Sequence, residues 1–153
     1  TEPHGGFTKA EKPVLPVIEG GPYGFEHVNV AAQRRDAESM LNWTERMIRM
    51  RKEAPEIGWG SFSVLDCGDT GVLAMRYDWR NNAVVIIHNL HDKPVDISFD
   101  PGVGESGRVL IDIADGSDSS ADEKGRHNMV IEPFGYRWYR AGGLDYLLKR
   151  SDI

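Results

Sequence analysis

The spacing of apolar residues changes near residue 60, from a helical period to a strand period. Residues 37–53 carry apolar side chains over more than half of a helix circumference. Asp36 is a suitable N-cap for this segment, and Pro55 follows its end. The pattern therefore predicts one long α-helix over residues 37–53. Because an isolated helix of this length is marginal in water, we expect it to need a packing partner on more than one face.

From residue 62 onward the apolar positions alternate with polar ones in short runs bounded by turn residues. We expect strands at residues 62–64, 72–75, 83–87, 95–99, 109–111, 129–131 and 136–139. The run at 83–87 is continuously apolar and rich in β-branched residues, which predicts a central strand buried on both faces. Short strands in this number predict a mostly β fold, an antiparallel β-sandwich or Greek-key barrel.

Residues 1–35 contain no periodic element, because Gly and Pro recur every few positions. Apolar residues are nevertheless frequent there, more so than in disordered linkers. A loop of this length is uncommon in a compact domain, so we expect an extended segment that lies on another surface. The predicted organisation is a loop and helix over residues 1–56, a β domain over 57–141, and a tail over 142–153 that holds a short helix.

Composition and charge exclude several classes of partner. Residues 1–57 carry 8 Lys/Arg and 9 Asp/Glu, and residues 58–153 carry 10 and 15, which gives net charges of −1 and −5. An acidic chain without a basic stripe disfavours nucleic acid and membrane surfaces as partners. No apolar run approaches the roughly 20 residues of a membrane helix. Cys67 is the only cysteine, which excludes a disulfide framework and predicts a cytoplasmic location.

The chemistry-bearing residues form no convincing catalytic or metal motif. His88 and His91 lie where a predicted strand runs into a turn, without a second group of ligands, so a surface position is expected. The acidic stretch at residues 112–124 lacks the alternating ligands of a calcium loop and is predicted to be solvated. No serine lies in a Gly-x-Ser-x-Gly elbow, and Cys67 has no basic neighbour in sequence. We therefore expect no catalytic residue, no metal and no cofactor within this chain.

Aromatic residues of the β domain offer a candidate sugar-binding surface. Trp79, Tyr136 and Trp138 form the candidate platform, since aromatic faces pack well against pyranose rings. In a strand, however, Tyr136 and Trp138 point to one side and Arg137 and Tyr139 to the other. Core packing of part of this set therefore stays open as the alternative.

Several short motifs carry a resemblance to a known family. The segments are residues 3–8 (PHGGFT), 15–17 (LPV), 28–30 (VNV), 33–36 (QRRD) and 39–43 (SMLNW). They resemble the segment after the eighth barrel strand of the α-amylase superfamily, glycoside hydrolase family 13. Residues 47–55 (MIRMRKEAP) are similar to its last barrel helix, and residues 133–139 (PFGYRWY) to the closing strand of its C-terminal β domain. Among subfamilies the chain is most similar to the trehalose synthases (maltose α-glucosyltransferases), while oligo-1,6-glucosidases share the motifs less fully.

The resemblance implies a place for each segment. Residues 1–35 would be the eighth loop at the substrate rim of a (β/α)8 barrel, and residues 37–53 its eighth helix. The β domain would buttress that barrel. His4, Gly5, Gly6 and Phe7 would edge the sugar pocket. The family's catalytic Asp, Glu and Asp lie on earlier strands, so the resemblance assigns no catalytic residue here, and the Arg-containing motif that opens the eighth loop is absent.

The leading hypothesis is a noncatalytic C-terminal part of an enzyme that interconverts maltose and trehalose by retaining glycosyl transfer. Two alternatives stay open: the sandwich itself binds α-glucan, or the parent enzyme is a hydrolase such as an oligo-1,6-glucosidase or α-glucosidase. The expected partners are the catalytic barrel, α-glucosidic sugars in the parent enzyme, and a second copy of the chain through the helix and loop.

Overall fold

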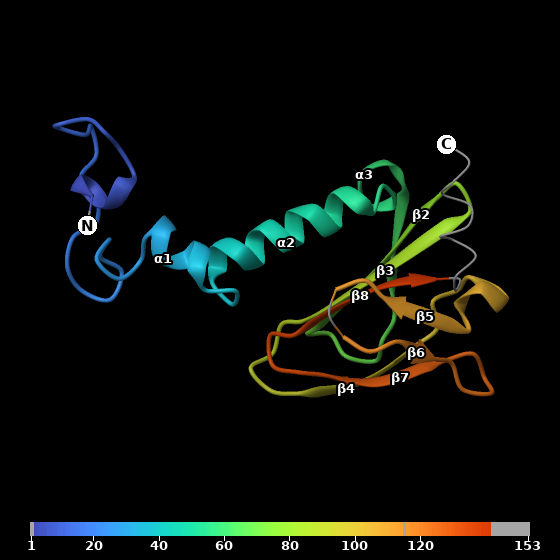
Figure 1. Cartoon of the computed structure of the whole chain (residues 1–153). Coiled ribbons are helices and arrows are strands. Elements are labelled where there is room, and N and C mark those ends of the chain that lie inside the picture. The colour runs from blue at the N-terminus through green and yellow to red at the C-terminus, as the bar shows by residue number, and fades with distance from the viewer. Residues whose placement is uncertain (1, 115, 142–153) are drawn as a thin grey trace. The chain divides into compact units, whose positions relative to one another are not determined.

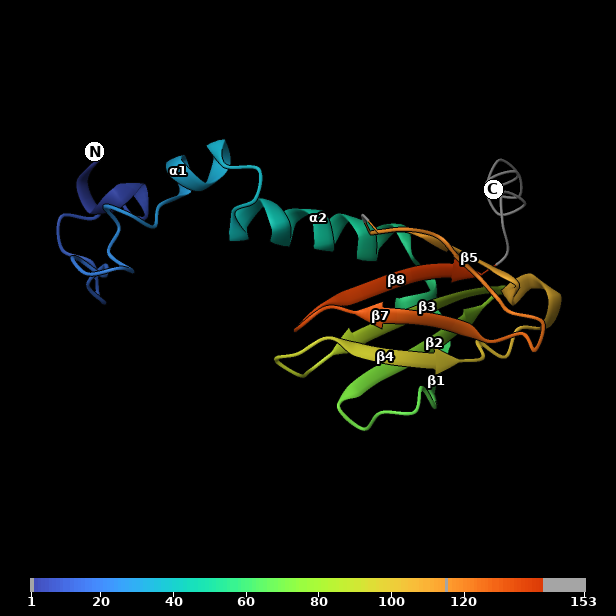
Figure 2. The same cartoon turned by 90° about the horizontal axis from the view of Figure 1, so that it is seen from below.

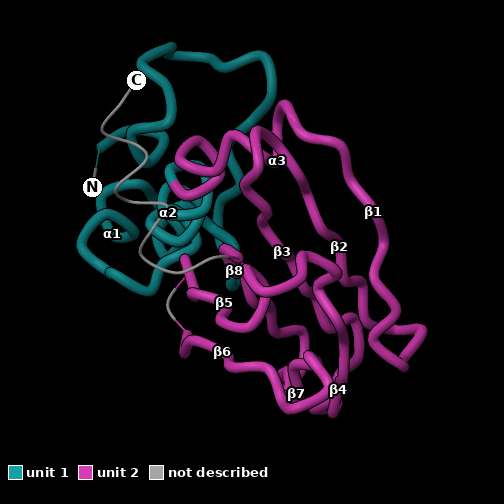
Figure 3. The backbone as a smooth tube through the Cα atoms, turned by 90° about the vertical axis from the view of Figure 1, so that its right-hand side faces the viewer, with its two compact units in different colours: residues 1–49 teal, residues 50–153 magenta. Residues whose placement is uncertain are grey.

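The computed structural model describes residues 2–114 and 116–141. The chain divides into two compact units, Thr1–Arg49 and Met50–Ile153, and the division falls inside the long helix (Figure 3). The domain boundaries expected from the sequence stay a prediction. The short helix expected within residues 142–153 lies outside the described residues.

The first unit holds a 3₁₀ turn, η1 (Pro3–Gly6), a short helix, α1 (Val30–Arg35), and most of the long helix α2 (Met40–Glu53) (Figure 1). The expectation that residues 1–35 contain no regular element is therefore wrong at α1, while η1 has non-helical backbone at His4 and Gly5. Asn29 caps α1, since its side chain accepts the backbone N–H of Ala32 at 2.8 Å. A helix of six residues completes fewer than two turns, so it leaves no recognisable hydrophobic period.

Helix α2 begins at Met40 rather than at residue 37. Asp36, predicted as its N-cap, is instead the C-cap residue of α1. Ser39 takes the capping role, because its hydroxyl accepts the backbone N–H of Asn42 at 3.3 Å. The predicted end at Glu53 is confirmed. Among the described residues, neither α2 nor any other helix is long and apolar enough to cross a membrane.

The second unit is the β domain. Its helical elements are α3 (Glu56–Trp59) and the 3₁₀ turn η2 (Gly104–Gly107), and its strands are β1 (Ser61–Leu65), β2 (Val72–Trp79), β3 (Asn82–Asn89), β4 (Val95–Phe99), β5 (Val109–Asp112), β6 (Ser119–Ser120), β7 (His127–Ile131) and β8 (Tyr136–Ala141). All seven predicted strands are confirmed, and α3, β6 and η2 were not predicted. The β2–β3 turn has Arg80 and Asn81 at φ 49° and 63°, the left-handed backbone that a tight hairpin requires.

The strands form two antiparallel layers. One sheet has the order β1-β2-β3-β8-β5-β6, and the other pairs β4 with β7 (Figures 1 and 2). The predicted antiparallel sandwich is confirmed. Central strand β3 is buried on both faces, as expected. Val85 and Ile87 face the core between the sheets, where they join Ile97 and Phe99. Val84 points to the opposite face of the larger sheet.

Candidate functional site

The loop that the resemblance places at a sugar pocket has an unusual backbone. His4, Gly5 and Gly6 lie at φ 53°, 60° and 76°, three consecutive residues in the left-handed region. A side chain at Gly5 would place a Cβ 2.8 Å from the Cβ of Phe25, so this position accepts only glycine without rearrangement. Phe7, the next residue of the motif, is half exposed.

These four residues therefore form one tight turn, and the side chain of Phe25 lies against it at Gly5. Left-handed backbone outside glycine is costly, and such strain concentrates at ligand sites and clamps. The role of His4, Gly5, Gly6 and Phe7 at a pocket rim stays a prediction.

A second set of motif residues builds the corner between α1 and α2. The side-chain carbonyl of Gln33 accepts the backbone N–H of Leu41 at 2.9 Å, and its backbone carbonyl accepts the hydroxyl of Ser39 at 2.6 Å. The amide of Asn42 donates to the backbone carbonyls of Gln33 and Asp36 at 2.9 and 2.7 Å. The QRRD and SMLNW motifs therefore have a structural purpose, namely to fix the direction in which α2 leaves α1.

The aromatic residues predicted as a sugar platform do not lie together. Trp79 pairs with Asn82 at one end of β3, and Tyr136 pairs with His88 near the other end. Six residues of strand separate these ends, roughly 20 Å. Trp138 is 7% exposed, and its place in β8 puts it on the face of the larger sheet opposite the core between the sheets. Burial leaves little of the Trp138 ring open to a sugar, and sugar binding by Trp79, Tyr136 or Trp138 stays a prediction.

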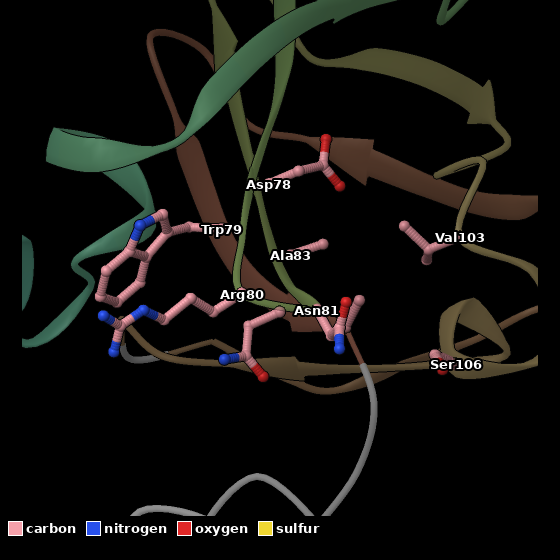
Figure 4. A pocket seen from close by; sticks show the side chains of 9 residues that line it. Asp78, Trp79, Arg80, Asn81, Ala83, Val103 and Ser106 are labelled. Atoms are coloured by element: carbon pink, nitrogen blue, oxygen red, sulfur yellow. The ribbon is translucent and has the colours of Figure 1, made fainter. Parts of the chain in front are cut away.

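Trp79 borders a surface hollow of about 310 Å³ at the β2–β3 turn (Figure 4). The guanidinium of Arg80 lies 4.5 Å from the centre of the Trp79 ring and covers one of its faces. The remaining wall is mainly polar, with Asp78, Asn81 and Ser106 around it (Figure 4). The hollow offers hydrogen bonds, but the ring face that a sugar would stack on is partly occupied by the chain's own arginine.

His88 and His91 lie three positions apart in the sequence but contact different residues. His91 Nε2 lies 2.9 Å from Asp69 Oδ1, and this hydrogen bond, helped by the Gly71 backbone N–H, lowers the pKa of Asp69. His88 lies beside the Tyr136 ring, 6.2 Å between centroids, and burial lowers the pKa of His88. Within the described residues, no group of three or more His, Cys, Asp or Glu side chains could hold a metal ion.

In the acidic loop at residues 112–124, aspartate carboxylates accept backbone N–H groups and so stabilise turns. Asp122 accepts the backbone N–H groups of Lys124 and Arg126, both at 2.9 Å. The Arg126 hydrogen bond is the main reason why the pKa of Asp122 lies below its ordinary value. Asp118 accepts the backbone N–H of Asp112 at 2.9 Å in the same way. These are structural roles, and residue 115 lies outside the described part of the chain.

The sequence did not predict a buried ion pair between strand β8 and helix α3. Arg140 Nη1 lies 3.2 Å from Glu56 Oε1, with Glu56 0% and Arg140 8% exposed. The same guanidinium reaches the backbone carbonyl of Glu53 at 3.5 Å. The pair anchors α3, and with it the end of α2, on strand β8. The only signal in the sequence was an arginine among the apolar residues of a closing strand.

Comparison with known proteins agrees with this architecture. The family model described as the C-terminal domain of sucrose hydrolase-like proteins matches residues 82–140. The trehalose synthase of Pimelobacter sp. is 30% identical over 130 residues, which cover 82% of this chain and 22% of that protein. The trehalose synthase of Thermus thermophilus is 27% identical over 125 residues, covering 80% and 13%. The chain thus spans about a fifth or less of the length of these relatives.

Solved structures show the same fold. A mutant of MUTB, from crystals soaked with trehalulose, superposes with a TM-score of 0.66 at 20% identity, covering 92% of this chain and 24% of that one. The α-amylase from H. orenii superposes at 0.60 and 22% identity, covering 80% and 24%. The sandwich fold is shared with these structures, and the matches support similarity to the C-terminal domain of trehalose synthase-like enzymes of the α-amylase superfamily, glycoside hydrolase family 13. Among the curated relatives, the chain is similar to the trehalose synthases.

Proposed function

We propose that the whole protein to which this chain belongs interconverts maltose and trehalose, and that this chain supplies its C-terminal domain without contributing a catalytic group. The observation that carries the proposal is the similarity to a trehalose synthase over 82% of the chain. A retaining glycosyl transfer needs a carboxylate nucleophile and a carboxylic acid about 5 Å apart. The proposal assigns both to the part of such an enzyme that this chain does not cover.

The environment of the chain's own carboxylates supports this division. Glu56 is paired with Arg140 in the interior, Asp78 with Arg76 at 2.8 Å, and Asp69 with His91. A general acid needs a raised pKa, because it must hold its proton near neutral pH. The pKa of Asp69 lies below its ordinary value, and the same holds for Asp122, so both are shifted in the opposite direction.

The proposal also places the turn at His4, Gly5, Gly6 and Phe7 against the bound sugar in the whole enzyme. Phe7 is the side chain of this turn with the most apolar surface to offer, and it is half exposed. We expect Phe7→Ala to raise KM for maltose more than it lowers kcat, because the ring would bind sugar equally in ground and transition states. Unchanged KM and kcat would remove the turn from the pocket.

The activity is tested by incubating the whole protein with maltose and measuring trehalose and free glucose. The proposal expects trehalose as the main product, and no turnover above buffer from the 153-residue chain alone. Glucose as the main product would make the whole protein a hydrolase. Turnover by this chain alone would refute the assignment of the chemistry to another part. A cytoplasmic location, suggested by the lone buried Cys67, is proposed with it and is checked by cell fractionation.

A further inference from the structure

The turn between β2 and β3 carries an arginine where its backbone favours other residues. Trp79 pairs with Asn82, so Arg80 and Asn81 alone form the turn, both with positive φ. Two-residue turns of this kind prefer Asn or Gly, which tolerate left-handed backbone, and Asn81 fits that preference. Arg80 does not, because its Cβ crowds the following carbonyl oxygen in this conformation. The backbone thus gives no reason for an arginine here, and any advantage comes from its side chain.

The Arg80 side chain covers one face of the Trp79 ring. Its guanidinium lies 4.5 Å from the ring centre, and Arg80 is exposed to solvent. Within the described residues, no hydrogen bond or ion pair holds the guanidinium in this place. A cation–π contact at an exposed site is weak, and an exposed side chain changes rotamer within nanoseconds. Arg80 is therefore a removable cover, and a ligand with a larger apolar face can take its place on the indole.

The hollow beside the Trp79 ring offers hydrogen bonds on several sides. Its volume of about 310 Å³ lies at the small end of ligand pockets. The side-chain amides of Asn81 and Asn82 carry both donors and acceptors, and so does the hydroxyl of Ser106 from η2 (Figure 4). Ala83 and Val103 add apolar wall. The lining therefore suits a compact ligand that has hydroxyl groups and one apolar face.

The charges around the hollow favour a neutral ligand over an anion. Asp78 also lines the hollow, and its Oδ2 accepts the Nε–H of Arg76 at 2.8 Å. The Asp78 carboxylate repels a phosphate or carboxylate ligand that Arg80 would otherwise attract. Carboxylate and amide groups both form hydrogen bonds with hydroxyl groups. A pyranose ring meets these conditions, since it is neutral, carries several hydroxyl groups, and has an apolar C–H face that packs on an indole.

We propose that the hollow at the β2–β3 turn binds one glucosyl ring of an α-glucan, with the Trp79 indole as its stacking surface and Arg80 as the cover that the sugar displaces. The choice of glucose rests on the proposed function, since the whole protein would then work on glucosyl disaccharides. The sugar site itself rests on the hollow and its lining. A pyranose on the indole removes apolar surface of both partners from water, and so replaces the shielding that Arg80 otherwise provides.

Fluorine NMR of the 153-residue chain, produced with fluorinated tryptophan, tests the site at the ring itself. The chain holds four tryptophans, and Trp79→Phe identifies the resonance of Trp79. Trp59 is the internal control, because it is 78% exposed but does not line the hollow. Millimolar maltotriose should shift the Trp79 resonance and leave that of Trp59 in place. Sorbitol, which carries hydroxyl groups but no ring, should shift neither.

Two variants test the cover and the hollow separately. Arg80→Gly removes the cover and accepts positive φ, so the Kd for maltotriose should fall about two- to fivefold, the factor that an exposed cation–π contact is worth. Ser106→Tyr, at an exposed position of η2, fills the hollow and should raise the Kd at least about tenfold. Glu105→Tyr is its matched control, since it puts the same ring on the same turn outside the lining and should leave the Kd unchanged.

A Trp79 resonance that maltotriose leaves in place would overturn the proposal, and so would equal shifts with sorbitol. An unchanged Kd in Ser106→Tyr would show that the sugar lies outside the hollow and would overturn it as well. Weaker binding in Arg80→Gly would refute the role of Arg80 as a cover. Maltotriose binding at Trp79, together with a whole protein that fails to make trehalose, would uphold the sugar site and refute the proposed function alone. Trehalose formation without any shift at Trp79 would do the reverse.

Discussion

Arg140→Met removes the partner of a carboxylate that has no access to water. Glu56 is 0% exposed and Arg140 Nη1 is its hydrogen-bonded partner at 3.2 Å. Breaking a buried pair from one side costs about 3–5 kcal/mol, because the remaining charge stays buried without compensation. The free energy of unfolding of a domain is about 5–15 kcal/mol, so the variant should lose about a fifth or more of it. An m-value of about 2 kcal/mol per M turns this loss into a fall of about 2 M in the urea midpoint.

Urea unfolding followed by circular dichroism measures the effect. Arg137→Met is the matched control, since it removes the same side chain from the same strand at a site where the guanidinium donates to the Tyr136 carbonyl and no buried carboxylate depends on it. The control should cost less than about 1 kcal/mol. The double variant Glu56→Met with Arg140→Met should recover most of the stability, because no buried charge is left. Equal losses for Arg140→Met and Arg137→Met, or strictly additive effects in the double variant, would refute this reasoning.

Three further outcomes are expected. Asn42→Ala removes two side-chain hydrogen bonds at the corner between α1 and α2. The variant should lower the protection of nearby amides against hydrogen exchange by about 1–2 kcal/mol. Unchanged protection would show that the corner does not need these two hydrogen bonds. Gly5→Ala should destabilise the first unit more than Gly20→Ala, because both have positive φ but only Gly5 has a side chain within contact, and equal thermal shifts would contradict this. His91→Ala should raise the pKa of Asp69 toward its ordinary value of 3.8 in an NMR titration. Because the folded-state pKa of Asp69 is lowered, its hydrogen bond to His91 stabilises the fold above the ordinary pKa, and this stabilisation is lost as pH falls through the folded-state pKa. If the substitution leaves the pKa of Asp69 unchanged, His91 is not the cause of its lowering.

The sandwich could be predicted from the sequence because most of its strands are marked by the pattern of their own apolar residues. The run at residues 83–87 is apolar at every position, and only a strand buried on both faces needs that. Strand β6, at Ser119–Ser120, has no such signal, since two polar residues pair with β5 only because the fold brings them there. The start of α2 was misplaced because both Asp36 and Ser39 are good caps, and the choice depends on the Gln33 network between α1 and α2.

The contacts of the candidate site residues were harder to predict from the sequence than the strands. The Arg140–Glu56 pair joins residues 84 positions apart, and a single sequence holds no record of such a contact. The aromatic alternation at 136–139 predicted the facing of Trp138 and Tyr139 but not their depth, which depends on what covers each face. The separation of Trp79 from Tyr136 follows from the register of β2, β3 and β8, which hydrophobic patterns do not specify.

The central claim is that this chain supports, and does not perform, glycosyl transfer. A retaining enzyme forms a covalent glycosyl intermediate on its nucleophile, and a fluorinated α-glucosyl fluoride accumulates that intermediate. The whole protein should be labelled with this reagent, digested and sequenced by mass spectrometry. The account predicts that the sugar is attached to a carboxylate outside these 153 residues. Attachment to any Asp or Glu of this chain would contradict it.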